Sequence, residues 1–230
     1  MNLTSIFASV VLLVICSPAS EVVSKAVQCE GGGYHYLLLG SSESSPSPAI
    51  MLLHGAGGQP IDMIDPWKNL ARQEHLILIA PGLPRDLKFE TLAPKVFRCI
   101  VEDARQQARI DPKRVYVFGN SMGGYLAFDA AMFESQYFAA VAVHGMVINQ
   151  DYYWIVKKAE RKTPIAIYIG DHDQFSTISE ARRTRDLLSK EGFPLDYVEI
   201  KDHDHNYWDV SERVNREAWR FFEKNSLPPL

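Results

Sequence analysis

The stretch Gly119-Asn120-Ser121-Met122-Gly123-Gly124 decides the fold. It follows an apolar segment, Arg114–Gly119, that is predicted to be a strand, and it opens a predicted helix, Met122–Phe133. Such a corner holds the serine in a strained backbone conformation and exposes its hydroxyl. The residues two positions before and after the serine are then crowded together, which requires glycine at both. The pattern G-x-S-x-G is a weak indication alone, but between a strand and a helix it strongly indicates a nucleophilic serine.

Apolar segments rich in strand-forming residues alternate with helical segments along the rest of the chain. Eight strands are expected, at Val22–Cys29, Tyr34–Leu39, Ile50–His54, Leu76–Ala80, Arg114–Gly119, Phe138–His144, Ile165–Gly170 and Leu195–Ile200. Helices are expected near Asp65–Glu74, Leu92–Arg109, Met122–Phe133, Ser176–Glu191 and Ser211–Lys224. The first two strands flank Glu30–Gly33 and predict an antiparallel hairpin, and right-handed crossovers are expected to join the others. The predicted fold class is therefore α/β, with a mostly parallel eight-stranded sheet and helices on both faces.

Length and composition indicate one globular domain. The chain has 230 residues, of which 47% are hydrophobic and 23% charged, an ordinary balance for a folded domain. We expect a single domain over residues 20–230, without internal repeats. The formal net charge is −4, and no long basic run is present. Nucleic acid is therefore not an expected partner.

The first nineteen residues differ from the rest and predict a signal peptide. Ile6–Cys16 is an apolar run too short to span a bilayer as a helix, and the small residues Ser17 and Ala19 that follow suit signal peptidase. An uncleaved anchor or a buried first helix is the alternative. We expect cleavage near Ala19, no membrane span in the mature chain, and a secreted or periplasmic protein.

The cysteines leave one question open. Cys16 would depart with the signal peptide, so the mature chain would hold Cys29 and Cys99. An even pair in an oxidising compartment favours a disulfide. Two buried free thiols are the alternative, because a sequence does not show whether the two Cα atoms approach within bridging distance.

A second glycine-rich segment, His54-Gly55-Ala56-Gly57-Gly58, follows the third predicted strand. Acyl transfer needs two N–H donors directed at the carbonyl oxygen that becomes negative. We expect the backbone N–H groups of Ala56 and Met122 to supply them. His54 is expected to brace this loop.

A serine hydroxyl also needs a base, and the base needs an acid that orients it. Asp171 and Asp173 follow the strand ending at Gly170, and His203 and His205 follow the last strand. The order Ser, Asp, His along the chain is that of the α/β-hydrolases. The same histidines, with Asp202 and Asp204, would permit a metal site, but that reading leaves the serine motif unexplained, and no metal or cofactor is expected.

With these motifs in view, the chain resembles single-domain α/β-hydrolases related to polyhydroxybutyrate-depolymerase-like and feruloyl-esterase-like enzymes. It also resembles the catalytic domain of prolyl-oligopeptidase-type peptidases. The likeness rests on Ile110–Val117, the serine motif and Phe138–Val141, and it extends over roughly residues 50–222. It implies that Ser121 is the nucleophile, Asp173 the acid and His205 the base. The glycine usual before that histidine is replaced by Asp204, so His203 remains an alternative base.

The resemblance and the triad order together indicate an esterase that acts through an acyl-enzyme on small-molecule or polymeric esters. No large lid is expected, because the segments between the triad residues are short. Aromatic side chains follow the ends of several predicted strands. They either line a substrate pocket or pack against a helix. Those expected to bind substrate are Tyr153, Trp154, Phe175 and Trp208. Two other functions stay open: a small serine peptidase or amidase of the same fold, and a non-catalytic binding module.

Overall fold

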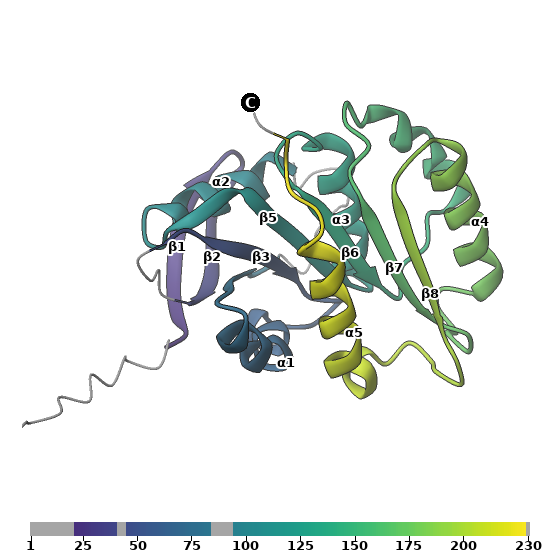
Figure 1. Cartoon of the computed structure of the whole chain (residues 1–230), viewed down its shortest axis with the longest axis horizontal. Coiled ribbons are helices and arrows are strands. Elements are labelled where there is room, and N and C mark those ends of the chain that lie inside the picture. Colours follow the sequence, from purple (N-terminus) through teal and green to yellow (C-terminus); the bar gives the residue numbers. More distant parts are fainter. Residues whose placement is uncertain (1–20, 41–44, 84–93, 229–230) are drawn as a thin grey trace, which may run out of the picture.

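The computed structural model describes residues 21–40, 45–83 and 94–228, so the predicted signal peptide lies outside the described residues. A single eight-stranded sheet runs through the molecule in the order β1-β2-β4-β3-β5-β6-β7-β8 (Figure 1). Its strands are β1 (Val23–Cys29), β2 (Gly32–Leu39), β3 (Ser47–Leu53), β4 (Ile77–Pro81), β5 (Ile110–Asn120), β6 (Ala140–His144), β7 (Ile165–Gly170) and β8 (Leu195–Ile200). The β1–β2 and β2–β4 pairs are antiparallel, and every other pair is parallel. The predicted fold class is confirmed.

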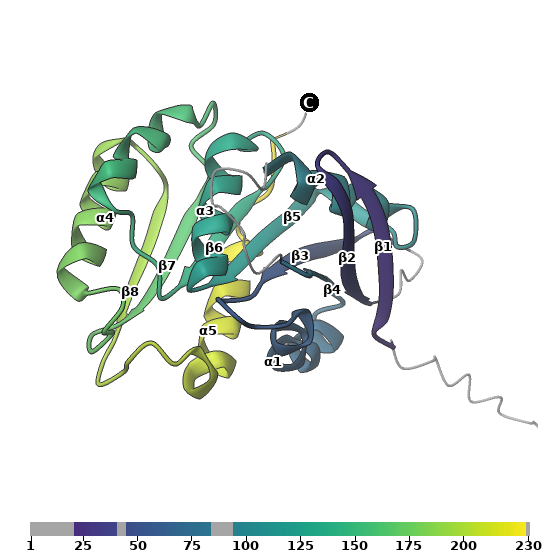
Figure 2. The same ribbon diagram turned by 180° about the vertical axis from the view of Figure 1, so that it is seen from behind.

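Helices cover both faces of this sheet. Helices α1 (Pro60–Gln73) and α5 (Tyr207–Phe222) pack on one face, and α2 (Pro94–Arg105), α3 (Met122–Phe133) and α4 (Ile178–Lys190) pack on the other (Figures 1 and 2). A 3-10 helix, η1 (Gln150–Lys158), lies beside α3. No large lid is built from the described part of the chain.

The central strands are apolar on both faces because each face meets a helical layer. In β5, Val115 and Val117 belong to the core under α2 and α3, whereas Tyr116 and Phe118 belong to the core under α1 and α5. Side chains alternate between the two faces of a strand, so a continuous apolar run fits a strand that is covered twice.

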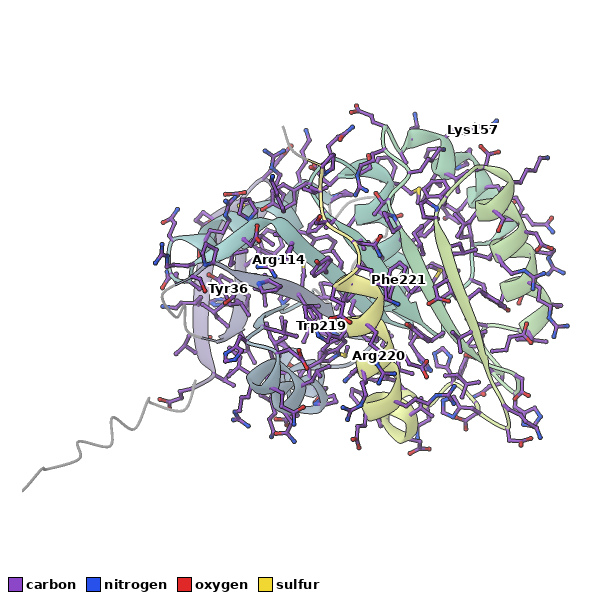
Figure 3. All side chains as sticks on the ribbon, viewed as in Figure 1. Tyr36, Arg114, Lys157, Trp219, Arg220 and Phe221 are labelled. Atoms are coloured by element: carbon purple, nitrogen blue, oxygen red, sulfur yellow. A yellow bond between two sulfur atoms is a disulfide. The ribbon has the colours of Figure 1, made fainter. Side chains whose placement is uncertain are left out.

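Helix α5 closes the second core with aromatic side chains. Phe222 stacks on Tyr116 with 4.7 Å between ring centroids, and Trp219 meets the same ring edge-on. Arg220, the neighbour of Trp219, is exposed (Figure 3). The Tyr116 hydroxyl donates a 2.8 Å hydrogen bond to the carbonyl oxygen of Asn225, which ties the segment after α5 to the sheet.

Several predicted boundaries were wrong. The opening turn is shorter than expected, because Cys29 pairs directly with Gly32 and only two residues connect the strands. Helix α1 begins five residues before its predicted start: Pro60 suits the first helical turn, and Asp62 accepts the N–H of Gln59. Helix α5 likewise begins earlier, where the side chain of Asn206 accepts the N–H of Trp208.

The segment after β6 forms η1, which was not predicted because its apolar residues lack a clear helical period. Helix α2 ends at Arg105, earlier than expected, and the first two residues of the predicted helix lie outside the described ranges. Within the residues described, no helix is both long and apolar enough to cross a membrane.

Cys29 and Cys99 form a disulfide, with 6.1 Å between their Cα atoms. The bridge joins the end of edge strand β1 to α2, 70 residues further along the chain. The alternative of two free thiols is therefore not what the structure contains.

Candidate active site

Ser121 occupies a sharp corner between β5 and α3, at φ 53° and ψ −118°. Its N–H donates a 2.8 Å hydrogen bond to the carbonyl oxygen of His144 on the neighbouring strand β6. A Cβ atom at Gly119 would lie 2.1 Å from the carbonyl oxygen of Gly123, and one at Gly123 would lie 2.1 Å from that of Leu53. Both contacts are with backbone, so glycine is required at both positions for steric reasons.

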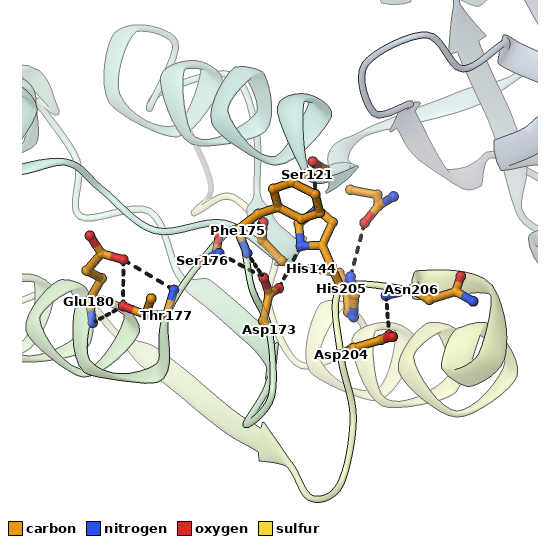
Figure 4. A network of polar contacts seen from close by, with 12 residues as sticks. Ser121, His144, Asp173, Phe175, Ser176, Thr177, Glu180, Asp204, His205 and Asn206 are labelled. Carbon is orange, nitrogen blue, oxygen red and sulfur yellow. Dashed lines mark hydrogen bonds and ion pairs between the residues drawn. The ribbon is translucent and has the colours of Figure 1, made fainter.

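The structure brings Ser121, His205 and Asp173 into one hydrogen-bonded chain (Figure 4). The Ser121 Oγ lies 2.9 Å from Nε2 of His205, and the Nδ1 of His205 lies 2.6 Å from Oδ2 of Asp173. The three residues come from the ends of β5, β8 and β7, which meet at one edge of the sheet. Their arrangement allows a proton to pass from the serine hydroxyl to the imidazole while a carboxylate orients the ring.

Asp173 is held as a carboxylate by its own loop. Its side chain is fully buried, and its Oδ1 accepts 2.8 Å hydrogen bonds from the N–H groups of Phe175 and Ser176. Burial alone would raise the pKa of Asp173, but the hydrogen bonds from His205, Ser176 and Phe175 outweigh it and lower the pKa below its ordinary value. The carboxylate therefore stays ionised beside the imidazole.

The two histidines after β8 have different positions. The imidazole of His205 lies between Ser121 and Asp173, whereas that of His203 is buried beside His144, with 5.8 Å between ring centroids. In the described structure, no hydrogen bond joins His203 to Ser121. Gly170 makes room for this loop, since a Cβ there would lie 2.2 Å from the carbonyl oxygen of His203. Asp171 accepts the His203 N–H through Oδ1 at 3.3 Å and so braces the loop.

Gly145 is a site residue that the sequence analysis missed. It has φ +62°, and a Cβ atom there would lie 2.8 Å from Cε1 of His205 and 3.5 Å from Oδ2 of Asp173. Its carbonyl oxygen also accepts a 3.1 Å hydrogen bond from Ser176 Oγ. The only signal in the sequence is a glycine directly after a predicted strand, which many turns share.

Behind the serine, His144 and Asn120 form a second buried pair that was not predicted. The Nδ1 of His144 lies 3.0 Å from Oδ1 of Asn120. Burial, followed by the nearby rings of His203 and His205, lowers the pKa of His144 to about 3. His144 is therefore neutral at physiological pH and adds no positive charge beneath the triad.

The glycine-rich loop after β3 lies directly against the serine. A Cβ atom on Gly55 would lie 3.4 Å from that of Ser121. The Nδ1 of His54 lies 2.8 Å from the Gly55 carbonyl oxygen, and its Nε2 accepts the N–H of Leu83 at 3.3 Å, so His54 braces the loop. Ala56 and Met122, the expected N–H donors, both line a hollow of about 820 Å³ at this side of the site.

The four aromatic residues expected to bind substrate are spread over the site. Phe175 is 73% exposed, and its ring stands 4.9 Å from that of His205 (Figure 4). Trp154 lines a second hollow of about 820 Å³ between α3 and η1. Tyr153 packs partly buried against the core beneath η1, and Trp208 packs on Tyr207 at the start of α5. The structure therefore places Phe175 against the triad and Tyr153 away from the hollow.

A metal site is not evident in this region. Across the ranges that the structure describes, no group of three or more His, Cys, Asp or Glu side chains is arranged to hold a metal ion. The rings of His203 and His205 contact different neighbours, so these two imidazoles are not arranged to bind one metal ion together.

Comparison with solved structures shows the same fold. A thermostable esterase matches with 19% identity and a TM-score of 0.71 over 89% of this chain and 63% of its own. An S-formylglutathione hydrolase from Staphylococcus aureus matches with 16% identity and a TM-score of 0.75 over 90% and 98%. The acylaminoacyl peptidase of Pyrococcus horikoshii matches with 13% identity and a TM-score of 0.72 over 92% and 43%.

The chain thus spans less than two thirds of the thermostable esterase and less than half of the peptidase. No curated protein matches it significantly by sequence. A family model does match: that of the dienelactone hydrolases, over residues 36–220. These residues hold every strand from β3 to β8 and all of the triad residues described above. The α/β-hydrolase assignment is confirmed, and the chain belongs to the dienelactone hydrolase family.

Proposed function

We propose that this protein hydrolyses carboxylic esters through a covalent acyl-enzyme formed on Ser121. The observation that carries the proposal is the continuous chain from Ser121 Oγ to His205 Nε2 at 2.9 Å and from His205 Nδ1 to Asp173 Oδ2 at 2.6 Å. A hydroxyl in that position can lose its proton to the imidazole as it attacks a carbonyl carbon.

The proposed reaction has two steps of acyl transfer. Ser121 attacks the ester carbonyl while His205 takes its proton, and the N–H groups of Ala56 and Met122 stabilise the resulting oxyanion. The protonated His205 then donates to the departing alkoxide, which leaves the acyl group on Ser121. A water molecule, deprotonated by His205, attacks the acyl-enzyme and releases the acid. Asp173 keeps the imidazole oriented in both steps, and the reaction needs no cofactor.

We propose small or aryl acyl esters, including those of polymers, as substrates. The exposed Phe175 ring beside His205 and the aromatic wall of the hollow between α3 and η1 support compact or planar groups. The peptidase reading is supported by the likeness to an acylaminoacyl peptidase, but that enzyme has more than half of its length outside the match.

Export is proposed from two observations. The predicted signal peptide over residues 1–19 directs secretion, and the Cys29–Cys99 disulfide suits an oxidising compartment. Sequencing the exported protein should find a first residue near Ser20; recovery of residues 1–15 would contradict the proposal. No nucleic-acid partner is proposed, because the net charge is negative.

Replacement of the serine tests the mechanism. Ser121→Ala should lower kcat by about 10⁴–10⁶, as expected when a triad nucleophile is removed, without changing the circular dichroism spectrum. A fluorophosphonate probe should label the wild-type protein and not the variant. Retention of more than a tenth of the wild-type kcat would exclude Ser121 as the nucleophile, and absence of both labelling and turnover in the wild type would favour a binding module.

A substrate panel tests the ester assignment. We expect kcat/KM for acetyl, butyryl and feruloyl esters to exceed that for a peptide anilide by a wide margin, because an alkoxide leaves more readily than an amine. The palmitoyl ester should rank below the shorter esters. If the anilide is the best substrate, the peptidase reading is correct and the ester assignment is wrong.

A further inference from the structure

A hollow of about 820 Å³ lies between α3 and η1, and the described residues that line it do not include Ser121, Asp173 or His205. Its walls are mostly apolar and aromatic, and the residues used below are Tyr125, Phe128, Asp129, Tyr152 and Trp154. Tyr125 and Asp129 follow Ser121 by four and eight positions on α3. Such positions lie along one side of a helix, and eight residues span about 12 Å of helix axis.

Among the described residues that line this hollow, Asp129 is the one that carries a charge. No hydrogen bond or ion pair reaches its carboxylate from the described parts of the chain. Burial raises the pKa of Asp129 to about 7. Asp129 is half-buried in this mostly apolar wall, where an unpaired carboxylate adds little to packing. Its presence is therefore better explained by a ligand than by packing.

The chemistry of the surrounding wall suits a positively charged group. The faces of aromatic rings attract cations, and clusters of aromatic rings recognise quaternary ammonium groups. The wall already accepts one such group, since Nζ of Lys158 lies 5.7 Å from the centroid of the Trp154 ring. Lys158 makes no ion pair with Asp129 in the described structure, so that carboxylate stays available.

We propose that this hollow binds an alkylammonium group of the substrate, with Asp129 as its counter-ion and Tyr152 and Trp154 as its aromatic wall. The substrate class is then an ester that carries a cationic amine remote from the reacting carbonyl. Tyr125 lies between the two ends, so the linking chain would run along α3 from Ser121 to Asp129. This inference rests on the proposed function only in taking the bound group to be part of an ester.

Binding can be measured without turnover in the Ser121→Ala protein. The probes are choline and 3,3-dimethylbutan-1-ol, which have the same shape but differ in the positive charge. We expect the cation to bind about fivefold more tightly than the neutral alcohol, since the aromatic wall is partly exposed and cation–π attraction is weaker there than in a desolvated site. Adding Asp129→Asn should remove this preference. NMR chemical-shift titration measures both dissociation constants.

A matched control separates a specific site from general attraction to an acidic protein. Asp151 is an exposed acid on the neighbouring η1. At pH 8.5, above the raised pKa of Asp129, Asp151→Asn changes the net charge by nearly as much as Asp129→Asn. We expect this variant, also in the Ser121→Ala background, to keep the full preference for choline. The proposal would be overturned if the Ser121→Ala protein bound choline and the neutral alcohol equally. It would also be overturned if Asp129→Asn and Asp151→Asn reduced the preference for choline by the same factor.

The outcome is distinguishable from a failure of the proposed function. Turnover of a neutral p-nitrophenyl ester by the wild-type protein reports on Ser121 chemistry alone. If that turnover is present but choline is not preferred, only the cation site is wrong. If turnover is absent while the Asp129-dependent preference is found, the site exists and the esterase proposal fails.

Discussion

His203 and His205, which are separated by one residue, occupy very different environments at this site. The imidazole of His205 bridges the serine and the aspartate, whereas the imidazole of His203 is buried beneath the same loop. The loop changes direction between them because Gly170 lets its backbone approach the end of β7 closely. The side chains are chemically identical, and only their placement distinguishes the proposed base from a core residue.

Substitution of each histidine tests this distinction. His205→Ala should lower kcat by about 10⁴ or more, since it removes the general base. His203→Ala should destabilise the protein by leaving a cavity but lower kcat by less than about tenfold, because its ring contacts no reacting group. Steady-state kinetics and urea denaturation of both variants measure the two effects. A mild His205 variant beside a severe His203 variant would reverse the assignment.

Asp129 should make folding stability depend on pH. The pKa of Asp129 rises from 3.8 to about 7 on folding, so between these values the folded chain holds a proton that the unfolded chain has released. Its contribution to stability therefore decreases as the pH rises through this window and stays low above it. Asp129→Asn removes this dependence.

We compare the free energy of unfolding of Asp129→Asn with that of the wild type at two pH values. The difference in favour of the variant should be larger at pH 8 than at pH 4, by about 1–3 kcal/mol. The free energy of unfolding from urea titrations at both pH values measures it. Asp151→Asn is the control, because that side chain is exposed, and it should show the same difference from wild type at both pH values. A gain at Asp129 that does not change with pH would contradict the buried, unpaired carboxylate.

At the scale of elements, connecting segments place the reacting groups while strands and helices hold them. Strands β5, β7 and β8 end at the same edge of the sheet, and each is followed by the loop or helix that carries one triad residue. The turn after β6 adds a fourth part: Gly145 has a left-handed conformation that leaves room for the His205 ring. Because four connecting segments form this site, the positions of its side chains depend on close contacts between those segments.

Gly145→Ala should therefore impair catalysis. The new methyl group would meet the His205 ring at 2.8 Å in a backbone conformation that disfavours side chains, and small misplacements of a reacting group cost on the order of 10²-fold in rate. We expect kcat to fall by about that factor. The measurement is kcat on a neutral p-nitrophenyl ester.

Gly192→Ala is the matched control for backbone strain. Gly192 also has a positive φ, +79°, but nothing lies within 4 Å of a Cβ placed there. This variant should lose about 1 kcal/mol of stability and keep its kcat. If both variants lose activity equally, strain alone accounts for the effect and the contact with His205 has no special role.

At the scale of the whole molecule, the disulfide and the proposed active site lie apart in the sheet. The Cys29–Cys99 bridge fixes β1, at one edge, to α2. The triad residues follow β5, β7 and β8, on the other side of the strand order. Stability and catalysis should consequently respond separately to loss of the bridge.

The double variant Cys29→Ser/Cys99→Ser tests that separation. Opening a loop of 70 residues should lower the free energy of unfolding by about 4 kcal/mol, because the unfolded chain regains conformational freedom. The kcat/KM for a small ester at 25 °C should stay within about twofold of wild type, because none of the proposed catalytic residues belongs to β1 or α2. Urea denaturation and ester kinetics measure the two quantities. A large loss of kcat/KM in a folded variant would show that β1 supports the site.

The α/β architecture and the serine corner could be predicted from the sequence because both depend on local patterns. Continuous apolar strands recur between helical segments, and the crowding at the corner involves Gly119, Ser121 and Gly123, which are close in the chain. The strand order depends on contacts between residues far apart in the chain. The predicted hairpin turn and helix starts were wrong by a few residues. The two helices begin earlier than predicted because of local contacts near Pro60 and Asn206.

Other features were decided only by the tertiary structure, because they join residues distant in sequence. The Cys29–Cys99 bridge follows from the packing of α2 against β1. The choice of His205 over His203 and the contact of Gly145 with His205 follow from the loops that meet at the ends of the strands. The unpaired Asp129 likewise depends on tertiary packing. The helical sequence around it does not show which residues from η1 line the hollow opposite α3. Sequence patterns thus determined the elements and the serine corner, whereas packing between elements determined which histidine meets Ser121, the disulfide and the charged hollow, because burial and approach are properties of the folded chain.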